Sequence, residues 1–256
     1  EVAGVDVVHP VGGAQAIAAM AYGTESVRKV DVIVGPGNVY VAQAKQQVAG
    51  AVGVPSAFTG PSEVVVVADG TSPAEFTATD LVAQAEHGPD GMSWLVTWNE
   101  AVADAVDAAL DRVLEDAPRG AEIAGTLASS GHCVLVDDEQ QALAVVDAIA
   151  PEHLQLMVDA PENLAERVRN AGAVFLGPWT PTSIGDYVAG PSHVLPTAGT
   201  ARFAGALTVA DFTKDVNLIT ADQDALRRLG PHVEALAVAE GLEAHAESIR
   251  VRRQHG

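Results

Sequence analysis

Short apolar runs alternate along the chain with longer amphipathic runs that have the period of a helix. The apolar runs are continuous and rich in β-branched residues, which is typical of strands covered on both faces of a sheet. They predict strands at residues 5–8, 32–34, 64–68, 94–97, 133–136, 155–158 and 174–176. Because predicted strands and helices alternate, we expect an α/β fold with a parallel sheet and helices on both faces.

Several predicted helices have recognisable ends. The sequence Ser72-Pro73-Ala74-Glu75 is typical of a capping box with proline at the first helical position, and Gly88-Pro89 ends that helix. A second helix follows Asn99 and stops before Pro118, with apolar residues at helical spacing. A third is predicted at about residues 139–149.

After about residue 210 the pattern changes, because no further strand is predicted. Residues 220–223 have the pattern of another capping box, Gly230-Pro231 separates two predicted helices, and the last helix starts at about His232. A helical tail of this kind cannot bury a core by itself. We therefore expect this C-terminal helical tail to pack on the α/β body or on another subunit.

The composition is that of a globular protein and narrows the possible partners. Hydrophobic residues make up 48% of the chain and charged residues 19%. The formal net charge of −20 repels phosphate backbones and anionic lipids, so we expect neither nucleic acid nor a membrane as partner. The longest apolar run, residues 16–22, is far shorter than the ~20 residues that a membrane span needs.

The single cysteine indicates the cellular compartment, and the first residues indicate how the chain starts. The single cysteine, Cys133, excludes an intramolecular disulfide and a zinc site built from cysteines. A reducing compartment is the natural expectation, so we predict a cytoplasmic protein. The chain begins without methionine and enters a predicted strand at once, which indicates a cleaved or truncated start.

A glycine-rich turn is the first candidate for binding chemistry. Gly35-Pro36-Gly37-Asn38 follows a predicted strand and opens a helix, where unpaired backbone N–H groups can bind a phosphate or a nucleotide. An ordinary tight turn with Asn38 as helix cap has the same sequence, and the motif is not GxGxxG. Gly12-Gly13-Ala14-Gln15 has the same layout and is a weaker signal.

Two pairs of polar residues could carry chemistry. Gln84 and His87 lie three residues apart near the end of a predicted helix, so both project from one face and could bind a metal or a substrate. Glu152 and His153 follow Pro151 at a helix-to-strand corner, where a carboxylate beside an imidazole can act as an acid–base pair. Taken singly, a polar helix end and a chance Glu-His in a loop are the commoner explanations.

Two later features are also candidates. Residues 183–193, rich in glycine and polar groups, follow the last predicted strand, where α/β enzymes keep their sites. A surface loop with Asp186 as a turn former fits this segment equally well. Glu240 and His245 lie five residues apart on the predicted last helix, about 140° around its axis, so they are surface groups unless another body docks there.

Taken together, these motifs resemble histidinol dehydrogenase. The matching segments, in chain order, are Gly12-Gly13-Ala14-Gln15-Ala16-Ile17-Ala18, Gly35-Pro36-Gly37-Asn38, Gly60-Pro61-Ser62-Glu63-Val64, Gln84-Ala85-Glu86-His87-Gly88-Pro89-Asp90, Pro151-Glu152-His153-Leu154, Gly185-Asp186-Tyr187 and His193-Val194-Leu195-Pro196-Thr197. The resemblance runs from about Val11 to His245. It implies the C-terminal portion of a family member that lacks roughly the first 170 residues.

The resemblance implies one zinc ion for each site. Its implied ligands are Gln84, His87, Asp186 and His245, the last reaching the site of the other subunit in a homodimer. Nitrogen and oxygen ligands with open positions suit a zinc that orients substrate rather than a structural zinc.

The resemblance also implies the reaction, which is oxidation of L-histidinol to L-histidine with two NAD, through a bound L-histidinal. His153 is the implied base in both oxidations, and Glu152 is implied to activate the water that attacks the aldehyde. The implied substrate-binding residues are Ser62, Gln84, His87, His153, Asp186, Glu240 and His245. Gln15 and Asn38 are the implied contacts to NAD.

Three parts follow from the resemblance, and alternative functions stay open. Residues 1–61 are expected to belong to an NAD-side Rossmann-like domain, residues 62–207 to a zinc- and substrate-side domain, and residues 208–256 to a helical dimerisation tail. One alternative is a family relative that oxidises another small polyol or a hydroxylated sulfonate. Another is an inactive fragment that binds zinc, and a zinc hydrolase is a weaker idea.

Overall fold

The computed structural model describes residues 4–56 and 60–254 of the chain. Contacts between residues divide the chain into two compact units, residues 1–212 and residues 213–256. We call them the first unit and the helical unit, and describe each by itself. The predicted three-part division at residues 61/62 and 207/208 stays a prediction.

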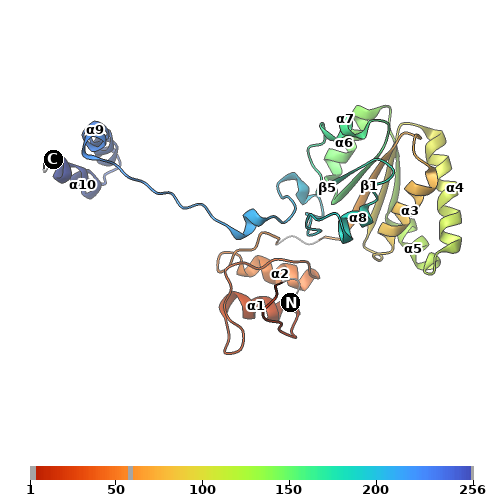
Figure 1. The fold of residues 1–256 in the computed structure, drawn as a ribbon, viewed down its shortest axis with the longest axis horizontal. Helices are drawn as coiled ribbons and strands as arrows, with labels where there is room; N and C mark the ends of the chain where they lie inside the picture. The colour runs from red at the N-terminus through yellow and green to blue at the C-terminus, as the bar shows by residue number, and fades with distance from the viewer. Residues whose placement is uncertain (1–3, 57–59, 255–256) are drawn as a thin grey trace. The chain divides into compact units, whose positions relative to one another are not determined.

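A five-stranded parallel sheet forms the centre of the first unit, in the order β3-β2-β1-β4-β5 (Figure 1). The strands are β1 (Glu63–Ala68), β2 (Met92–Thr97), β3 (Gly131–Leu135), β4 (His153–Met157) and β5 (Ala173–Leu176). The five later strand predictions are therefore confirmed to within two residues at each end. The register pairs Val64 with both Ser93 and His153, so β1 lies at the centre with β2 and β4 on either side.

Helices cover both faces of this sheet, as the alternating pattern predicts. On one face, α3 (Ala74–Ala85) and α4 (Glu100–Asp116) pack over Val64, Val66 and Met157. On the other, α6 (Glu139–Ile149) and α7 (Pro161–Ala165) pack over residues that include Val65 and Leu156. Because β1 is buried at every position, it carries apolar side chains on both faces, which explains its continuous run of valines.

Two predicted strands near the N-terminus are wrong. Residues 5–8 have no strand and are exposed, and residues 32–34 form only one bridge, between Val32 and Gly53. β-branched residues favour a strand only where a ladder of neighbouring strands is present, and the described chain provides no ladder at these positions. Instead, α1 (Gly13–Tyr22) and α2 (Val39–Val48) pack around a small core of Ile17, Ala21, Ile33, Val48 and Val52.

The helix ends are partly as predicted. The side chains of Asn38, Asn99 and Asp138 cap α2, α4 and α6 by accepting backbone N–H groups. The capping box at residues 72–75 is not formed, because Pro73 itself is the extended N-cap residue of α3 and no side chain caps that end. Helices α5 (Gly120–Ser130) and α8 (Thr182–Tyr187) are additional to those predicted.

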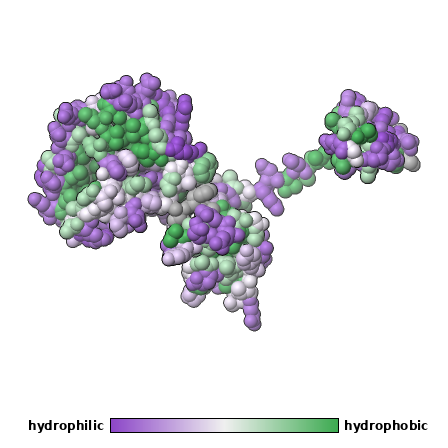
Figure 2. All heavy atoms as spheres, turned by 180° about the vertical axis from the view of Figure 1, so that it is seen from behind, coloured by the Kyte–Doolittle hydropathy of each residue, from purple (hydrophilic) through white to green (hydrophobic). Residues whose placement is uncertain are grey.

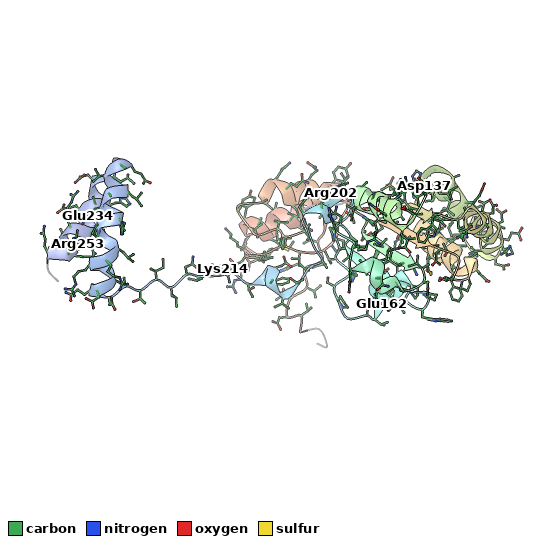
Figure 3. All side chains as sticks on the ribbon, turned by 90° about the horizontal axis from the view of Figure 1, so that it is seen from above. Asp137, Glu162, Arg202, Lys214, Glu234 and Arg253 are labelled. Atoms are coloured by element: carbon green, nitrogen blue, oxygen red, sulfur yellow. The ribbon has the colours of Figure 1, made fainter. Side chains whose placement is uncertain are left out.

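Short turns connect the last strand to the end of the first unit. Two 3₁₀ turns, η1 (Thr200–Arg202) and η2 (Val209–Phe212), follow α8. Arg202, labelled in Figure 3, donates to the backbone carbonyl of Ala148 at the end of α6. This contact fastens η1 to the helix that leads into β4.

The helical unit is a pair of helices, α9 (Gln223–Ala239) and α10 (Glu243–Gln254). The prediction that Gly230-Pro231 separates two helices is wrong, because α9 continues through Pro231. A Cβ on Gly230 would lie 2.7 Å from Arg253 Cδ and 2.9 Å from Ile249 Cγ2, so the bare glycine lets α10 approach closely. Packing between the helices thus overrides the low helix propensity of the Gly–Pro pair.

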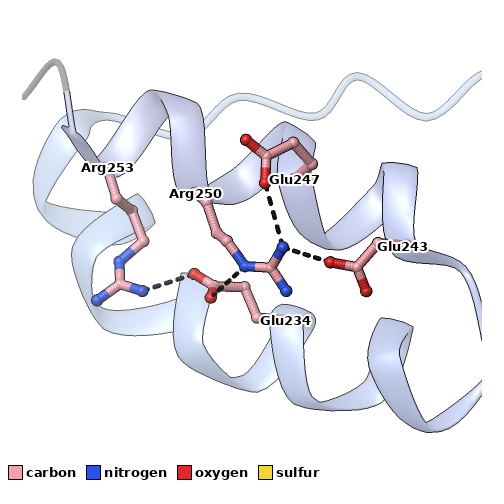
Figure 4. Close-up of polar contacts among 5 residues, drawn as sticks. All are labelled: Glu234, Glu243, Glu247, Arg250 and Arg253. Carbon is pink, nitrogen blue, oxygen red and sulfur yellow. Dashed lines mark hydrogen bonds and ion pairs between the residues drawn. The ribbon is translucent and has the colours of Figure 1, made fainter.

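Ion pairs join α9 to α10. The Arg250 guanidinium lies 3.5 Å from Glu234 and also pairs with Glu243 and Glu247 on its own helix (Figure 4). The Arg253 guanidinium lies 2.6 Å from the same Glu234 carboxylate. Most of these side chains are exposed, so each pair contributes little by itself, and a network of several is needed for a measurable effect.

Apolar residues are not confined to the cores. Figure 2 shows hydrophobic residues gathered at the surface of the sheet-bearing part and along the segment that leads to α9. In that segment Leu218 and Ile219 are more than nine-tenths exposed. Within the described part of the chain, no helix has the length and apolar character that crossing a membrane requires.

Glycine at position 185 is predicted to be required for the packing of α8 on β5. A Cβ there would lie 2.6 Å from Cζ of the buried Phe175 ring, so we expect Gly185→Ala to lower the free energy of unfolding by about 1–3 kcal/mol. Gly125, inside α5, is the matched control, because a Cβ there meets nothing within 4 Å.

For Gly125→Ala we expect a gain of about 0.5–1 kcal/mol, since alanine is the better helix former. Urea denaturation of the two variants measures both changes. Equal effects of the two substitutions would contradict the packing described for α8.

Candidate active site

The candidate site lies at the amino end of the sheet. Ser62 directly precedes β1, and Glu152 and His153 stand at the start of β4, next to β1 in the parallel register. Helix α3 connects the parallel strands β1 and β2, so its C-terminal end returns to the same edge and carries Gln84 there. This differs from the expectation that sites of α/β sheets lie at the carboxyl ends of strands.

His153 is the centre of a buried group of titratable side chains. Its Nδ1 lies 3.6 Å from Glu152 Oε2, and its Nε2 lies 3.6 Å from Asp186 Oδ1 on α8. The side chains of His153 and Glu152 are 7% and 9% exposed, while Asp186 is 32% exposed. The imidazole is therefore placed between two carboxylates, one enclosed and one open to solvent. The structure confirms that the Glu152–His153 pair and Asp186 come together.

Burial favours the uncharged forms of Glu152 and His153. Burial raises the pKa of Glu152 to about 7, and the nearby Glu63 and Asp186 carboxylates act in the same direction. The Glu63 backbone N–H, which donates to Glu152 Oε2 at 3.1 Å, and the Ser62 side chain oppose the rise in pKa. A carboxyl group with this pKa can exchange a proton near neutral pH.

The pKa of the His153 imidazole is lowered, which favours its neutral form. Burial lowers the pKa of His153, and His87 lowers it further, while Asp186 and the Glu63 backbone raise it. Neither ring nitrogen has a hydrogen-bond partner of ordinary geometry. A neutral, buried imidazole without a partner is suited to accept a proton from a group that enters the site.

A cavity of about 260 Å³ joins three of the four predicted metal ligands. Gln84, His87 and Asp186 line it, together with residues of α3 and α8 that include Thr182. Gln84 is 5% exposed and its Nε2 atom is buried without a hydrogen-bond partner. Across residues 4–56 and 60–254, no three His, Cys, Asp or Glu side chains are gathered to hold a metal, so a site here needs the Gln84 amide.

A second cavity, of about 170 Å³, connects the glycine-rich turn to the buried carboxyl group. Gly35, Gly37, Ser62, Glu152 and His193 are among its lining residues. Gly35 has a φ of +102°, a conformation that favours glycine. His193 also lines this cavity, and the sequence analysis assigns it no role. Its place in a matched motif is the only indication of it in the sequence.

Glu63 is a buried polar residue near the site, and its motif was the only indication of it in the sequence. Glu63 is 1% exposed, and its Oε1 has no hydrogen-bond partner. Burial raises the pKa of Glu63, whereas backbone N–H groups of Ala198, Gly199 and Glu152 lower it. Its carboxyl group therefore ties the start of β1 to the turn at residues 198–199.

The remaining predicted site residues belong to α1, to the start of α2 and to the helical unit. Asn38 caps α2, with Oδ1 accepting the Val41 N–H at 3.1 Å, and Gln15 is exposed in the first turn of α1. Glu240 and His245 belong to the helical unit, where both are exposed. They do not share one helix as predicted, because Glu240 ends α9 and His245 lies in α10, beyond a turn at Gly241 with φ of +73°.

A larger cavity, of about 590 Å³, lies between α4, α5 and β3 and is not lined by the Glu152–His153 pair. His132 and Cys133 line it among apolar side chains such as Leu110 and Leu127. Burial raises the pKa of the Cys133 thiol, and the Asp107 and Asp104 carboxylates raise it further, which makes it a weak nucleophile. The amino edge of the sheet is therefore the candidate active site.

Comparison with known proteins identifies the family of the chain. The family model for histidinol dehydrogenase matches residues 1–253. Histidinol dehydrogenase of Parasynechococcus marenigrum is 51% identical over 250 residues, which cover 98% of this chain and 57% of the relative. That of Cereibacter sphaeroides is 50% identical over 250 residues, again covering 98% of this chain and 57% of the relative.

A solved structure matches the same extent of chain. The crystal structure of histidinol dehydrogenase from Elizabethkingia anophelis superposes with a TM-score of 0.93 at 36% identity, covering 99% of this chain and 58% of that chain. The chain thus spans less than two thirds of the length of the relatives that it matches. On the extent of the family match and the identity to its members, the chain belongs to the histidinol dehydrogenase family.

Proposed function

We propose that this chain provides the active site for NAD-dependent, zinc-assisted oxidation of L-histidinol to L-histidine through bound L-histidinal. The observation that carries the proposal is the buried pair of Glu152 and His153 at the amino edge of the sheet. Glu152 lines the second cavity, and His153 lies 3.6 Å from Asp186, which lines the first. Family membership supports the substrate, and the biosynthesis of histidine is the corresponding process.

The donors at the first cavity are compatible with zinc. Gln84, His87 and Asp186 offer an amide, an imidazole and a carboxylate, all of them nitrogen or oxygen donors. Gln84 Nε2 is buried without a hydrogen-bond partner, and an amide can exchange its nitrogen and oxygen positions by a flip, so no protein contact opposes a ligand role for the Gln84 oxygen. Zinc, when bound, would polarise and orient the substrate's nitrogen and oxygen atoms.

The second cavity is compatible with part of a nicotinamide dinucleotide, which takes up the hydride in each oxidation. The glycine-rich turn at residues 35–38 lets a ligand approach the backbone closely, because no neighbouring atom lies where a Gly35 Cβ would stand. Gln15 and Asn38 remain the proposed contacts to NAD. Ser62 and Glu152 line the same cavity, which connects the cofactor side to the acid–base pair.

The side chains have distinct proposed roles. His153 accepts the proton of the substrate hydroxyl while the carbon loses a hydride, which yields the aldehyde. Glu152, with its pKa of about 7, accepts a proton from the water that adds to that aldehyde. His153 then accepts a proton from the hydrate in the second oxidation. Retention of the aldehyde between the steps protects a reactive intermediate.

We further propose that the helical unit completes the site of the partner in a homodimer. Glu240 and His245 would then contact the substrate, with His245 as the fourth zinc ligand. The exposed positions of both side chains in the helical unit are compatible with this role. Activity, substrate and dimer are proposed for the longer protein, because the chain spans only 57% of its relatives' length.

Replacement of His153 separates chemistry from metal binding. We expect His153→Ala to reduce NADH formation by ~10²–10⁴-fold, because the proton acceptor is lost, while bound zinc stays at the wild-type amount. Activity is measured by NADH absorbance and zinc by elemental analysis, with exposed His232→Ala as the matched control. Wild-type turnover in His153→Ala would remove this residue from the mechanism.

The pH dependence of the rate tests the role of Glu152. A base with a pKa of about 7 works only when deprotonated, so kcat/KM is expected to rise with pH and level off above about 7. In Glu152→Gln, which keeps an acceptor for the Glu63 N–H, the rate is expected to fall and this limb to disappear. An unchanged limb in that variant would assign the titration to another group.

Mixing of inactive variants tests the crossed site. Chains with His153→Ala and chains with His245→Ala each lack one component, but a mixed dimer would hold one site with both residues intact. We expect the mixture to recover up to about a quarter of wild-type activity after subunit exchange. No recovery in a mixture shown to exchange subunits by mass spectrometry would contradict the assignment of His245 to the partner's site.

A further inference from the structure

Lys45 is an unusual residue in the first unit. The chain has three lysines, and Lys29 and Lys214 are exposed, with Lys214 labelled in Figure 3 on the extended segment before α9. Lys45, on α2, is only 2% exposed and is the largest fully buried side chain among the described residues. Lysine is almost never fully buried without a reason, because removing an ammonium from water is costly.

The Lys45 ammonium binds the backbone on both sides of α2. Its Nζ donates to the carbonyl oxygen of Gly35, ten residues earlier, and to that of Ser56, eleven residues later, at 3.2 Å. The side chain points back toward the start of its helix, as long side chains in helices do. One amino group thus ties the turn that precedes α2 to the segment that follows it.

No counter-charge explains this burial. Within residues 4–56 and 60–254, no carboxylate lies within ion-pairing distance of Lys45. Burial lowers the pKa of its ammonium. An apolar side chain of similar length would fill the same space without the cost of desolvation. The two hydrogen bonds are therefore the specific contribution of this residue.

Both carbonyl groups belong to residues of one cavity wall. Gly35 and Ser56 line the cavity of about 170 Å³ that also contains Ser62 and Glu152. Gly35 has a φ of +102°, and a Cβ on Gly37 would lie 2.3 Å from Val41 Cγ1, so this turn has an uncommon conformation held close to α2. The hydrogen bond from Lys45 Nζ to the Gly35 carbonyl oxygen holds this turn against α2.

We propose that Lys45 is a positioning residue that sets the width of the cavity by holding the Gly35 turn and the Ser56 segment together. It touches backbone only and acts through the cavity wall. The inference rests on the proposed function, which places part of the dinucleotide in this cavity. Loss of the ammonium should therefore weaken dinucleotide binding much more than it slows the chemical steps at Glu152 and His153.

The test compares Lys45→Met and Lys45→Arg in the full chain, with Lys29→Met as the matched control. NADH is the probe, its affinity measured by fluorescence titration, and hydrogen exchange is followed at the amides of Gly35, Gly37, Asn38 and Ser56. We expect Lys45→Met to weaken NADH binding by about tenfold or more and to speed exchange at these amides. Lys45→Arg, which keeps donors, should fall in between, and Lys29→Met should match the wild type.

The outcomes separate this inference from the proposed function. NADH affinity and exchange rates in Lys45→Met that equal those of the wild type would overturn the positioning role. Failure of the wild type itself to bind NADH would overturn the cofactor assignment, and exchange at residues 35–38 would still decide the role of Lys45. If Lys45→Met does not fold, weaker NADH binding in a folded Lys45→Arg supports the inference and wild-type binding overturns it.

Discussion

The candidate site depends on one buried contact, that of the Glu152 carboxyl group with the His153 imidazole between the amino ends of β1 and β4. Both groups are shielded from solvent, so neither is stable there as an isolated charge. The Glu63 N–H donates to the Glu152 carboxyl group and compensates for part of its desolvation. The Glu152 backbone carbonyl accepts the Ala173 N–H at 2.9 Å, which fixes the start of β4 to β5. The parallel register of β1, β4 and β5 is what places these groups together.

The same edge of the sheet holds polar atoms that the protein itself leaves without partners. These atoms are Gln84 Nε2, both ring nitrogens of His153 and Glu63 Oε1. Each unsatisfied buried polar atom lowers the stability of a fold, and such atoms are rare in native proteins. Their concentration around one acid–base pair is expected of a site that is completed by ligands, and it is the physical reason to place function here.

The sequence alone predicts much of the sheet and little of the way the site is assembled. The valine run of β1 and the helix at Glu139–Ile149 follow from local patterns that the fold does not override. Local patterns fail where packing decides: residues 5–8 lack a strand partner, and Gly230 allows α9 to continue through Pro231. The buried lysine and the pairing of His153 with Asp186 arise from contacts between distant segments, which no local spacing reveals.

The number of NADH molecules formed for each L-histidinol consumed tests the central claim most directly. We would measure it with zinc and excess NAD, for this chain and for a form extended to the full length of its relatives. The account predicts two NADH for each L-histidinol from the extended form, because one site performs both oxidations. No NADH from either form, with zinc confirmed bound, would contradict the assignment of histidinol oxidation to this site.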